Sequence, residues 1–357
     1  MRIAQVSPLY ESVPPALYGG TERIVSNLTE ELVRAGHDVT LFASGDSRTQ
    51  ARLVAPCRRA LRLGNGWNDP LVPHVLMLEQ VFARADAGEF DVIHFHTDYL
   101  HYPLSRRCGV PAVTTMHGRM DLPDYRPLLA EYMDMPLVSI SDAQRAPVPE
   151  ANWKATVYHG LPRDLLRPGS GRGGYLAFLG RIAPEKGPDR AIEIARRVGM
   201  PLRIAAKVDA KDREYFERVI RPLIRPPHVE YIGEICDSRK SEFVGEAEAV
   251  LFPIDWPEPF GIVMIEAMAC GTPVIAFRCG SVPEIVHHGE TGFVVSSVEE
   301  AVHAVREVRG LSRRRCREVF EARFTSERMA ADYLRVYREV IADRARPPRA
   351  VWRGVAG

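Results

Sequence analysis

Residues 258–275 read Glu258-Pro259-Phe260-Gly261-Ile262-Val263-Met264-Ile265-Glu266-Ala267-Met268-Ala269-Cys270-Gly271-Thr272-Pro273-Val274-Ile275. The stretch predicts a loop with a glycine, a helix over 262–269 that Gly271 ends, and the start of a buried strand. Glu258 and Glu266 bracket the glycine, and the backbone amides of Gly261, Ile262 and Val263, next to Phe260, form an anion site at the start of the helix. Two carboxylates on either side of an anion site suit a sugar, a diphosphate and a ribose in a row.

Short apolar runs alternate with helical patterns on both sides of this stretch, which is typical of α/β proteins with parallel sheets. The runs are nearly continuous, as expected for strands that are covered on both faces. We predict strands at 3–7, 39–43, 92–96, 112–116, 137–141 and 156–159, and again at 175–179, 202–206, 229–232, 250–253, 273–277 and 293–295. The simplest fold is two Rossmann-like, doubly wound domains that face a central cleft.

The break between the two series contains Pro162, Pro168 and the glycine-rich segment 169–174, which we predict to be a flexible, polar linker. We therefore expect an N-terminal domain over 1–165 and a C-terminal domain over 166–325; the family resemblance described below implies that the first is the acceptor side and that the second binds a nucleotide sugar. A last helical pattern covers 326–343, and its apolar face carries Met329, Tyr333, Val336, Tyr337 and Val340. The tail over 344–357 is rich in Pro, Arg and Gly, and we predict that it is disordered.

The composition, 46% hydrophobic and 26% charged, is that of a soluble globular protein, and the net charge of +1 gives no reason to expect nucleic acid as a partner. No apolar run approaches the roughly 20 residues that cross a bilayer, so we expect at most peripheral membrane contact. The N-terminus enters a strand pattern without a signal-peptide core, which predicts a cytoplasmic protein. The six cysteines form no CxxC pair and are expected to be reduced thiols.

Two glycine motifs differ in what they indicate. Gly169, Gly171 and Gly174 match G-x-G-x-x-G, but the match precedes a strand and no helix follows it, so we interpret it as a hinge and not as a dinucleotide site. Gly19 and Gly20 lie directly before a predicted helix over 22–35, where backbone amides favour an anion. Two glycines in an ordinary turn are the alternative interpretation of this second motif.

Arg181 and Lys186 lie in the pattern G-R-x-x-x-x-K-G, just beyond the carboxyl end of the strand predicted at 175–179. Ligands of open α/β sheets bind at this edge. Two cations there would stabilise a diphosphate, both when it is bound and when it leaves. A pair of surface charges is the alternative, and we favour the diphosphate.

The histidines need separate treatment. His117 follows the strand at 112–116 and precedes Gly118, which suits a ligand contact. His94, His96 and Asp98 alternate along and beyond another strand and therefore share one face. We favour an acceptor-side lining for these three, with plain packing as the alternative. A metal triad is the weakest interpretation, because this spacing on a buried strand makes a poor facial site.

With these motifs in view, the sequence resembles the retaining glycosyltransferases of family 4, which have the GT-B fold, over nearly the whole chain. The resemblance implies that the helix at 326–343 crosses back onto the N-terminal domain. Because no D-x-D motif is present, it also implies an enzyme without a metal or a cofactor, whose nucleotide sugar is a co-substrate. The implied roles are donor-sugar hydroxyls for Glu258, ribose for Glu266, diphosphate for Arg181 and Lys186, phosphate for Gly20, and the donor sugar for His117.

Finer details are similar to one subgroup, which contains the UDP-glucose:tetrahydrobiopterin glucosyltransferases and an avilamycin-pathway glycosyltransferase. This likeness implies UDP-glucose as donor, a small-molecule acceptor and a front-face substitution that retains the anomeric configuration. One departure lies at 159–162, where most of the family has Asn-Gly-Val-Asp. The segments that carry the likeness are Ser12-Val13-Pro14-Pro15, His117-Gly118-Arg119, Tyr158-His159-Gly160-Leu161-Pro162 and Asp255-Trp256-Pro257-Glu258.

Several alternatives stay open at the level of the sequence. The donor could be of the GDP-mannose type, and the acceptor could be a glycan or a lipid. An epimerase or a phosphorylase could share the architecture, and a non-catalytic nucleotide-sugar sensor could share the binding residues. The sequence does not indicate the oligomeric state.

Overall fold

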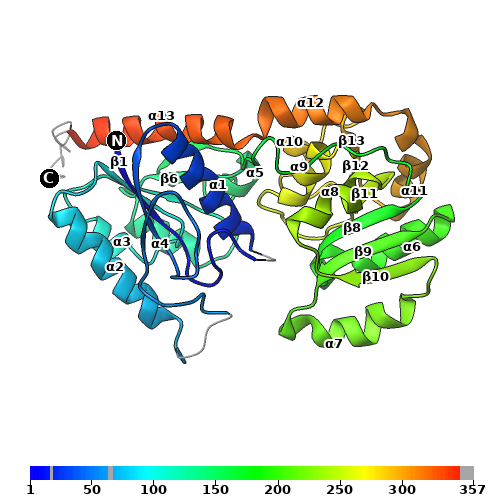
Figure 1. Cartoon of the computed structure of the whole chain (residues 1–357), viewed down its shortest axis with the longest axis horizontal. Helices are drawn as coiled ribbons and strands as arrows, with labels where there is room; N and C mark the ends of the chain where they lie inside the picture. The colour runs from blue at the N-terminus through cyan, green and yellow to red at the C-terminus, as the bar shows by residue number, and fades with distance from the viewer. Residues whose placement is uncertain (17–18, 63–66, 346–357) are drawn as a thin grey trace, which may run out of the picture.

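The computed structural model describes residues 1–16, 19–62 and 67–345, and it contains two α/β domains side by side (Figure 1). Tyr18, in the predicted glycine loop, and most of the predicted tail, 346–357, lie outside the described residues. Each domain is built around one parallel sheet with helices on both faces, as the alternating pattern predicts. The two-domain fold predicted from the sequence is therefore confirmed.

The described part of the N-terminal domain forms a seven-stranded parallel sheet in the order β3-β2-β1-β4-β5-β6-β7. This order reverses direction at β1, so the crevice beside β1 and β4 opens at the carboxyl ends of the strands. The strands are β1 (Arg2–Val6), β2 (Asp38–Phe42), β3 (Arg52–Val54), β4 (Val92–Phe95), β5 (Ala112–Thr115), β6 (Leu137–Ser139) and β7 (Trp153–Thr156). The helices are α1 (Gly20–Arg34), α2 (Leu71–Asp86), α3 (Tyr102–Ser105), α4 (Tyr125–Glu131) and α5 (Asp142–Arg145).

The C-terminal domain repeats this plan in a six-stranded parallel sheet, ordered β10-β9-β8-β11-β12-β13. Its switch point lies between β8 and β11. The strands are β8 (Leu176–Arg181), β9 (Leu202–Lys207), β10 (Val229–Gly233), β11 (Ala249–Phe252), β12 (Val274–Phe277) and β13 (Gly292–Val295). The helices are α6 (Pro188–Val198), α7 (Arg213–Tyr215), α8 (Asp237–Gly245), α9 (Ile262–Ala269), α10 (Val282–Ile285), α11 (Val298–Glu307) and α12 (Arg313–Arg323).

Four elements differ from the sequence prediction. The last strand of the first sheet, β7, ends at Thr156, where we predicted a strand to begin. The short edge strand β3 and the long helix α2 were not predicted, because neither shows a clear period against its surroundings. The sequence pattern also predicts a helix over 212–224, but this segment is a chain of short helical turns. Pro222, which lacks a backbone N–H, lies in the last of them.

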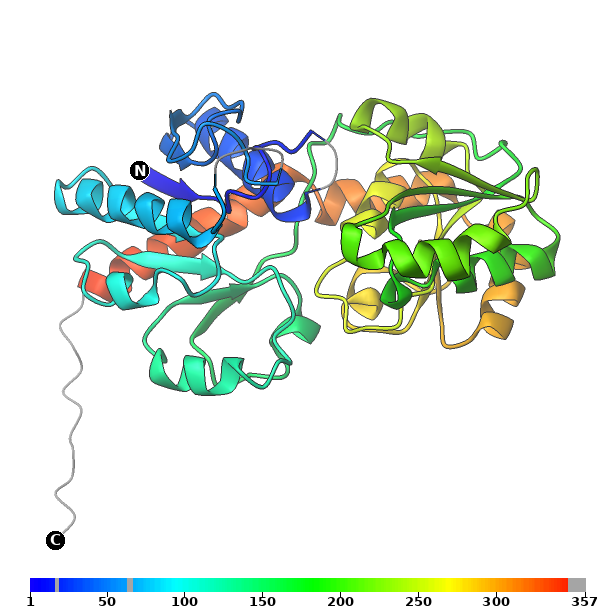
Figure 2. The same cartoon turned by 90° about the horizontal axis from the view of Figure 1, so that it is seen from below.

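The apolar face of α13 (Ser326–Ala345) packs on the N-terminal domain. Both views of the ribbon show the helix leaving the C-terminal domain and running along the N-terminal one (Figures 1 and 2). Its buried side chains contact the cores of α1, β1 and β4, and the tyrosines are fully enclosed. The residues that form this face are Met329, Tyr333, Val336, Tyr337 and Val340.

The two connections between the domains touch each other. Leu161 on the outgoing connection forms a parallel bridge with Thr325 on the returning one. The backbone N–H of Leu161 donates to the carbonyl of Phe324, and that of Ser326 donates to the carbonyl of Leu161, each at 2.9 Å. A Cβ atom on Gly160 would lie 2.2 Å from the Thr325 carbonyl oxygen, so only glycine allows this approach.

The segment 169–174 is not the flexible linker that we predicted. The backbone N–H groups of Gly169, Gly171 and Gly173 donate to carbonyl oxygens of the C-terminal domain at 2.9–3.1 Å. The Arg313 guanidinium, on α12, adds hydrogen bonds to the carbonyl oxygens of Gly169 and Gly245. These bonds fix the segment on the C-terminal domain, and the crossing between domains occurs upstream, at 157–161.

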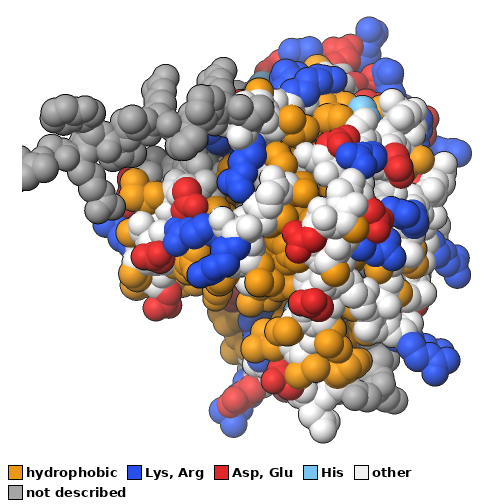
Figure 3. Space-filling model, turned by 90° about the vertical axis from the view of Figure 1, so that its left-hand side faces the viewer, with side chains coloured by type: hydrophobic (Ala, Val, Ile, Leu, Met, Phe, Trp, Pro, Cys, Tyr) orange, Lys and Arg blue, Asp and Glu red, His pale blue; other side chains and the backbone are white. Residues whose placement is uncertain are grey.

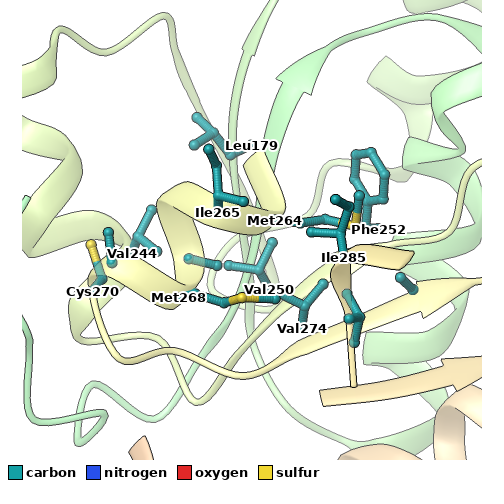
Figure 4. Packing of buried hydrophobic residues seen from close by; sticks show 14 of the residues in the cluster. Leu179, Val244, Val250, Phe252, Met264, Ile265, Met268, Cys270, Val274 and Ile285 are labelled. Atoms are coloured by element: carbon teal, nitrogen blue, oxygen red, sulfur yellow. The ribbon is translucent and has the colours of Figure 1, made fainter. Parts of the chain in front are cut away.

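The C-terminal core positions α9, the helix of the stretch that opened the sequence analysis. Figure 4 shows Met264, Ile265 and Met268 of α9 packed over the strands, close to Leu179 and Val250. This face is fully buried, so α9 cannot rotate and its first turn has a fixed position.

Two features of the described residues concern possible contact with a membrane: the length and polarity of the helices, and the exposed apolar side chains. No helix in the described ranges is both long enough and apolar enough to cross a bilayer. Figure 3 looks onto the end of the molecule formed by the N-terminal domain and shows hydrophobic side chains among charged ones. The start of α2 exposes Leu71, Val72, Val75 and Leu76.

Candidate active site

A cleft of about 930 Å³ lies between the domains, at the carboxyl ends of both sheets. This is the place where open α/β sheets bind their ligands. The cleft is lined by thirteen of the fourteen residues that we proposed for the site: Gly19, Gly20, His96, Asp98, His117, Arg181, Lys186, Glu258, Phe260, Gly261, Ile262, Val263 and Glu266. The exception is His94, which lies behind the cleft.

Two helix N-termini, one from each domain, meet in the cleft. Gly261 precedes α9 with a φ of 78°, and no side chain of the described residues caps the helix, so its first amides are open to the cleft. Gly20 starts α1, and a Cβ atom there would lie 3.5 Å from Ile262 Cδ1 on α9. Two such ends combine backbone donors and positive dipole ends, which favour an anion between the domains.

Glu258 lies on the loop before α9 and is buried among donors. Its Oε2 accepts from Lys186 Nζ at 2.5 Å and from Trp256 Nε1 at 2.9 Å. The Lys186 ammonium also lies 4.3 Å from the centre of the Trp256 ring, in a cation–π contact. The indole therefore holds both charges in place, a role that the sequence analysis did not assign to Trp256.

Glu266 projects from the second turn of α9 and bonds to a lysine that the sequence analysis missed. Lys240 Nζ, on α8, donates to Glu266 Oε1 at 2.6 Å and lies 3.1 Å from Asp237. Asp237 in turn pairs with Arg23 of α1, which links the two domains across the cleft. No local signal identifies Lys240, because a lysine in a polar helix usually faces water.

Arg181, at the end of β8, is surrounded by carboxylates and does not touch Lys186. It pairs with Glu185, and its guanidinium lies 3.6 Å from Asp209 and 3.8 Å from Asp212. Its buried Nε atom has no hydrogen-bond partner among the described residues. Both predicted cations line the cleft, and each is bound to carboxylates.

A buried hydrogen-bond chain fixes the ring of His117. The Gln5 amide donates to Tyr337 Oη at 2.8 Å, so its carbonyl oxygen accepts from His96 Nε2 at 2.9 Å. His96 Nδ1 then accepts from His117 Nε2 at 2.8 Å. This order leaves His117 Nδ1 as a hydrogen-bond acceptor, and the residue lines the cleft.

His94 does not line the cleft, which corrects its assignment to the acceptor side. Its Nδ1 lies 2.7 Å from Tyr337 Oη and its Nε2 lies 2.7 Å from Thr115 Oγ1. The alternation along β4 places His94 and His96 on one face, but α13 covers that face at His94. His94 therefore connects α13 to the sheet.

The histidines of this cluster are neutral at ordinary pH. Burial lowers the pKa of His117 to about 3 and holds the pKa values of His94 and His96 well below the usual range. His159, from the segment that departs from the family pattern, stacks on His117 at 5.3 Å, and burial lowers its pKa in the same way. None of the four can act as a general acid near pH 7.

No group of three or more His, Cys, Asp or Glu side chains is arranged to hold a metal ion within residues 1–16, 19–62 and 67–345. The rings of His94 and His96 bind Tyr337, Thr115, Gln5 and His117 through all four nitrogen atoms.

The fold and the cleft define a two-domain protein of the GT-B class. Two family models match the chain, one in each domain: "Glycosyltransferase Family 4" over residues 18–148 and "Glycosyl transferases group 1" over residues 170–318. Each domain thus matches a glycosyltransferase model, and the chain is a glycosyltransferase of the group 1 and family 4 type, an enzyme that transfers a glycosyl group.

Curated relatives match most of the chain at modest identity. The alpha-maltose-1-phosphate synthase of Mycolicibacterium smegmatis is 26% identical, over 96% of this chain and 100% of the relative. A D-inositol 3-phosphate glycosyltransferase of Pseudarthrobacter chlorophenolicus is 25% identical over 78% of each chain.

Solved structures share the fold. AviGT4, a glycosyltransferase involved in avilamycin A biosynthesis, superposes with a TM-score of 0.72 at 24% identity, over 96% of this chain and 98% of its own. HepE of Anabaena, whose structure holds UDP and glucose, gives 0.72 at 18% identity, over 95% of this chain and 100% of its own.

Proposed function

We propose that this glycosyltransferase moves a hexosyl group from a nucleotide diphosphate sugar, UDP-glucose, to a small-molecule acceptor with retention of the anomeric configuration. The observation that carries the proposal is the meeting of two uncapped helix N-termini, Arg181 and Lys186 in one cleft, flanked by Glu258 and Glu266. This arrangement suits a diphosphate between two hydroxyl-bearing groups. HepE of Anabaena, whose structure holds UDP and glucose, supports this donor.

In this proposal each residue binds a different part of the donor. Glu266, held by Lys240, accepts from the ribose hydroxyls, and Glu258 accepts from hydroxyls of the sugar. Arg181, Lys186 and the amides that follow Gly261 bind the diphosphate, and Gly19 and Gly20 close the site from the other domain. Lys186 bonds to Glu258 at 2.5 Å, so in this proposal it binds the sugar-contacting carboxylate and the diphosphate together.

The reaction that we propose is the front-face substitution that the resemblance to family 4 implies. The bond from sugar C1 to the β-phosphate oxygen breaks while the acceptor hydroxyl attacks C1 from the same face. The acceptor proton passes to the departing phosphate oxygen. The cations and helix ends stabilise the growing charge on that phosphate. Neutral His117 accepts a hydrogen bond from a sugar hydroxyl through Nδ1, and closure of the domains excludes water.

The test compares nucleotide sugars. The melting temperature of the purified protein is measured with UDP-glucose, UDP-galactose and GDP-mannose, since a donor at 100 times its Kd adds about 2.7 kcal/mol of stability. We expect UDP-glucose to stabilise most and to be hydrolysed slowly without acceptor. Preference for GDP-mannose would contradict the donor assignment, and binding without any turnover would indicate a sensor. The anomeric proton coupling of the product, measured by NMR, tests retention.

Metal dependence is tested with the same assay. We expect turnover to survive saturating EDTA, because the cations and helix N-termini of the cleft supply the positive charge for the diphosphate. Loss of turnover in EDTA and its return with Mg²⁺ or Mn²⁺ would contradict this mechanism. An EDTA-treated sample returned to buffer is the control for chelator damage.

A further inference from the structure

The N-terminal wall of the cleft exposes apolar side chains next to a single carboxylate. Tyr99, Leu100 and Leu122 line the cleft, and each exposes 39–43% of its surface. The Tyr125 ring, which also lines the cleft, lies edge-on to Tyr99 with the ring centres 6.1 Å apart. Apolar groups gathered on the wall of a concave site are typical of ligand pockets.

Asp98 is the carboxylate, and its surroundings are unusual. Its φ is 52°, the one positive value for a non-glycine residue in the described ranges. Strained backbone of this kind gathers at ligand sites, and aspartate tolerates it better than most residues. No hydrogen bond or ion pair of its side chain occurs among the described residues, and burial raises the pKa of Asp98 to about 6. The carboxylate lacks a donor, and a bound molecule can supply one.

The cations on this wall are already engaged. Arg62 pairs with Glu11 at 2.9 Å, and Arg23 pairs with Asp237. Arg119 binds Asp121 through two hydrogen bonds of 2.8 and 2.7 Å. The histidines that line the wall are neutral, as described above. An anionic acceptor would therefore meet the Asp98 carboxylate without a free cation to offset it.

We propose that the acceptor is a non-anionic small molecule with a flat apolar body, which packs on Tyr99, Leu100 and Leu122 and donates a hydrogen bond to Asp98. This inference rests on the proposed function and adds the acceptor class to it. A hydroxyl or N–H group of the acceptor donates to Asp98, and a second hydroxyl attacks sugar C1. The proton of the attacking hydroxyl goes to the departing phosphate, so Asp98 positions the acceptor and keeps its own protonation state.

The proposal separates this chain from some of its relatives. The curated relatives include enzymes named for D-inositol 3-phosphate and for L-malate, and both of these molecules are anions. In this cleft Asp98 lies three residues after the end of β4, and Tyr99, Leu100 and Leu122 line the same cleft. The proposal therefore predicts a measurable preference for an uncharged acceptor over an anionic one with the same flat body.

The experiment uses 3,4-dihydroxybenzyl alcohol and 3,4-dihydroxybenzoate, which share a flat body and two hydroxyls. Binding to the UDP-loaded protein is measured by calorimetric titration, and transfer from UDP-glucose is measured by mass spectrometry. We expect the alcohol to bind at least about 10-fold more tightly, a difference of ~1.4 kcal/mol. In Asp98→Asn, which keeps the backbone conformation accessible, we expect the preference to fall to within about threefold, with KM for the alcohol raised more than kcat is lowered.

Asp124→Asn is the matched control, because Asp124 is exposed on the same domain and does not line the cleft. It should keep the wild-type preference and the wild-type rate of UDP-glucose hydrolysis. Equal or tighter binding of the benzoate, or binding of neither probe, would overturn the inference while UDP-glucose hydrolysis stands. Failure of UDP-glucose to bind or to be hydrolysed would instead contradict the proposed function.

Discussion

Two lysines hold the two glutamates of the motif in place. Lys186 and Lys240 each bind one of them at 2.5–2.6 Å, and Arg181 is surrounded by carboxylates. Charge-assisted hydrogen bonds of this kind fix the orientation of both partners. The charged side chains of the cleft therefore have defined positions.

The first prediction concerns Arg181 and Lys186. Replacing either with alanine should reduce turnover about 10²–10³-fold, the scale for losing one group that stabilises the charge of the leaving phosphate. Initial rates with UDP-glucose measure the effect. Arg314→Ala is the control, because that arginine lies on α12 with 89% of its side chain exposed. Turnover within threefold of wild type for both variants would exclude the diphosphate role.

The second prediction concerns the buried histidines and pH. Burial lowers the pKa values of His94, His96, His101, His117 and His159, whereas in the unfolded chain they titrate near ~6.5. As the pH falls below that value, the unfolded chain takes up protons that the folded chain refuses, so stability is lost. Each histidine contributes up to about 1.4 kcal/mol per pH unit. Asp98, Glu11 and Glu22, whose pKa values burial raises, have the opposite sign and offset part of this loss.

The melting temperature, measured from pH 8 to pH 4.5, should therefore fall steeply below about pH 6. His101→Gln should flatten this slope, because the replaced ring bonds only to Ser105 and Thr114 and does not line the cleft. The exposed His303, replaced by Gln, should leave the slope unchanged. A melting temperature independent of pH in this range would contradict the buried neutral state of the histidines.

At the scale of elements, α13 connects the last part of the chain to the first strands. Tyr337 bonds to Gln5 on β1 and lies 2.7 Å from His94 on β4, and Tyr333 lies 2.8 Å from Thr115 on β5. The chain of bonds from Gln5 continues through His96 to His117 in the cleft. The helix therefore stabilises the N-terminal sheet and also supports the His117 ring that lines the cleft.

The third prediction follows from this packing. Ending the chain before Ser326 exposes the docking surface, and each large side chain lost is worth roughly 1.5–3 kcal/mol. Against a total stability of about 5–15 kcal/mol, the truncated protein should be insoluble or inactive. A chain that ends at Ala345 keeps all of α13 and is the control. Soluble truncated protein with wild-type turnover would show that the helix is dispensable.

At the scale of the whole molecule, the two chain segments that connect the domains lie side by side and are bonded to each other. The outgoing connection at Gly160 and Leu161 is bonded to the returning one at Thr325, close to the His159 ring in the cleft. If the domains close, we expect both connections to bend together, because the bridge keeps them in register. We therefore predict that the hinge consists of these paired segments, whereas the glycine-rich segment at 169–174 is bonded to the C-terminal domain.

The fourth prediction tests this hinge. Gly160→Ala places a Cβ atom 2.2 Å from the Thr325 carbonyl oxygen and forces the connections apart. Overpacking of this kind costs about 1–3 kcal/mol, so both the melting temperature and turnover should fall. Gly310→Ala is the matched control, since a Cβ atom there meets nothing within 4 Å. An unchanged melting temperature for Gly160→Ala would show that the connections separate easily.

Much of this architecture was predictable from the sequence. The alternation of strands and helices predicted both sheets, and α9 begins and ends where the pattern placed it. That the candidate residues line one cleft was largely predictable, because each motif is continuous in the sequence. The edge strand β3 and the helix α2 were not, because half-exposed elements carry a weak period. The partner of Glu266 was also hidden, since Lys240 lies 26 residues away in a polar helix.

The sequence by itself determined the two Rossmann-like domains and the motifs that form the donor side of the cleft, because local periodicity encodes which face of each element is buried. Only the tertiary structure decided that His94 lies behind the cleft and that Lys186 and Lys240 hold the two glutamates. It also decided that the domains are joined at Gly160 and Thr325. These features depend on contacts between residues far apart in the chain, such as His94 and Tyr337, which are 243 positions apart. The choice among such partners is made by packing, when α13 covers the first sheet and the two domains meet.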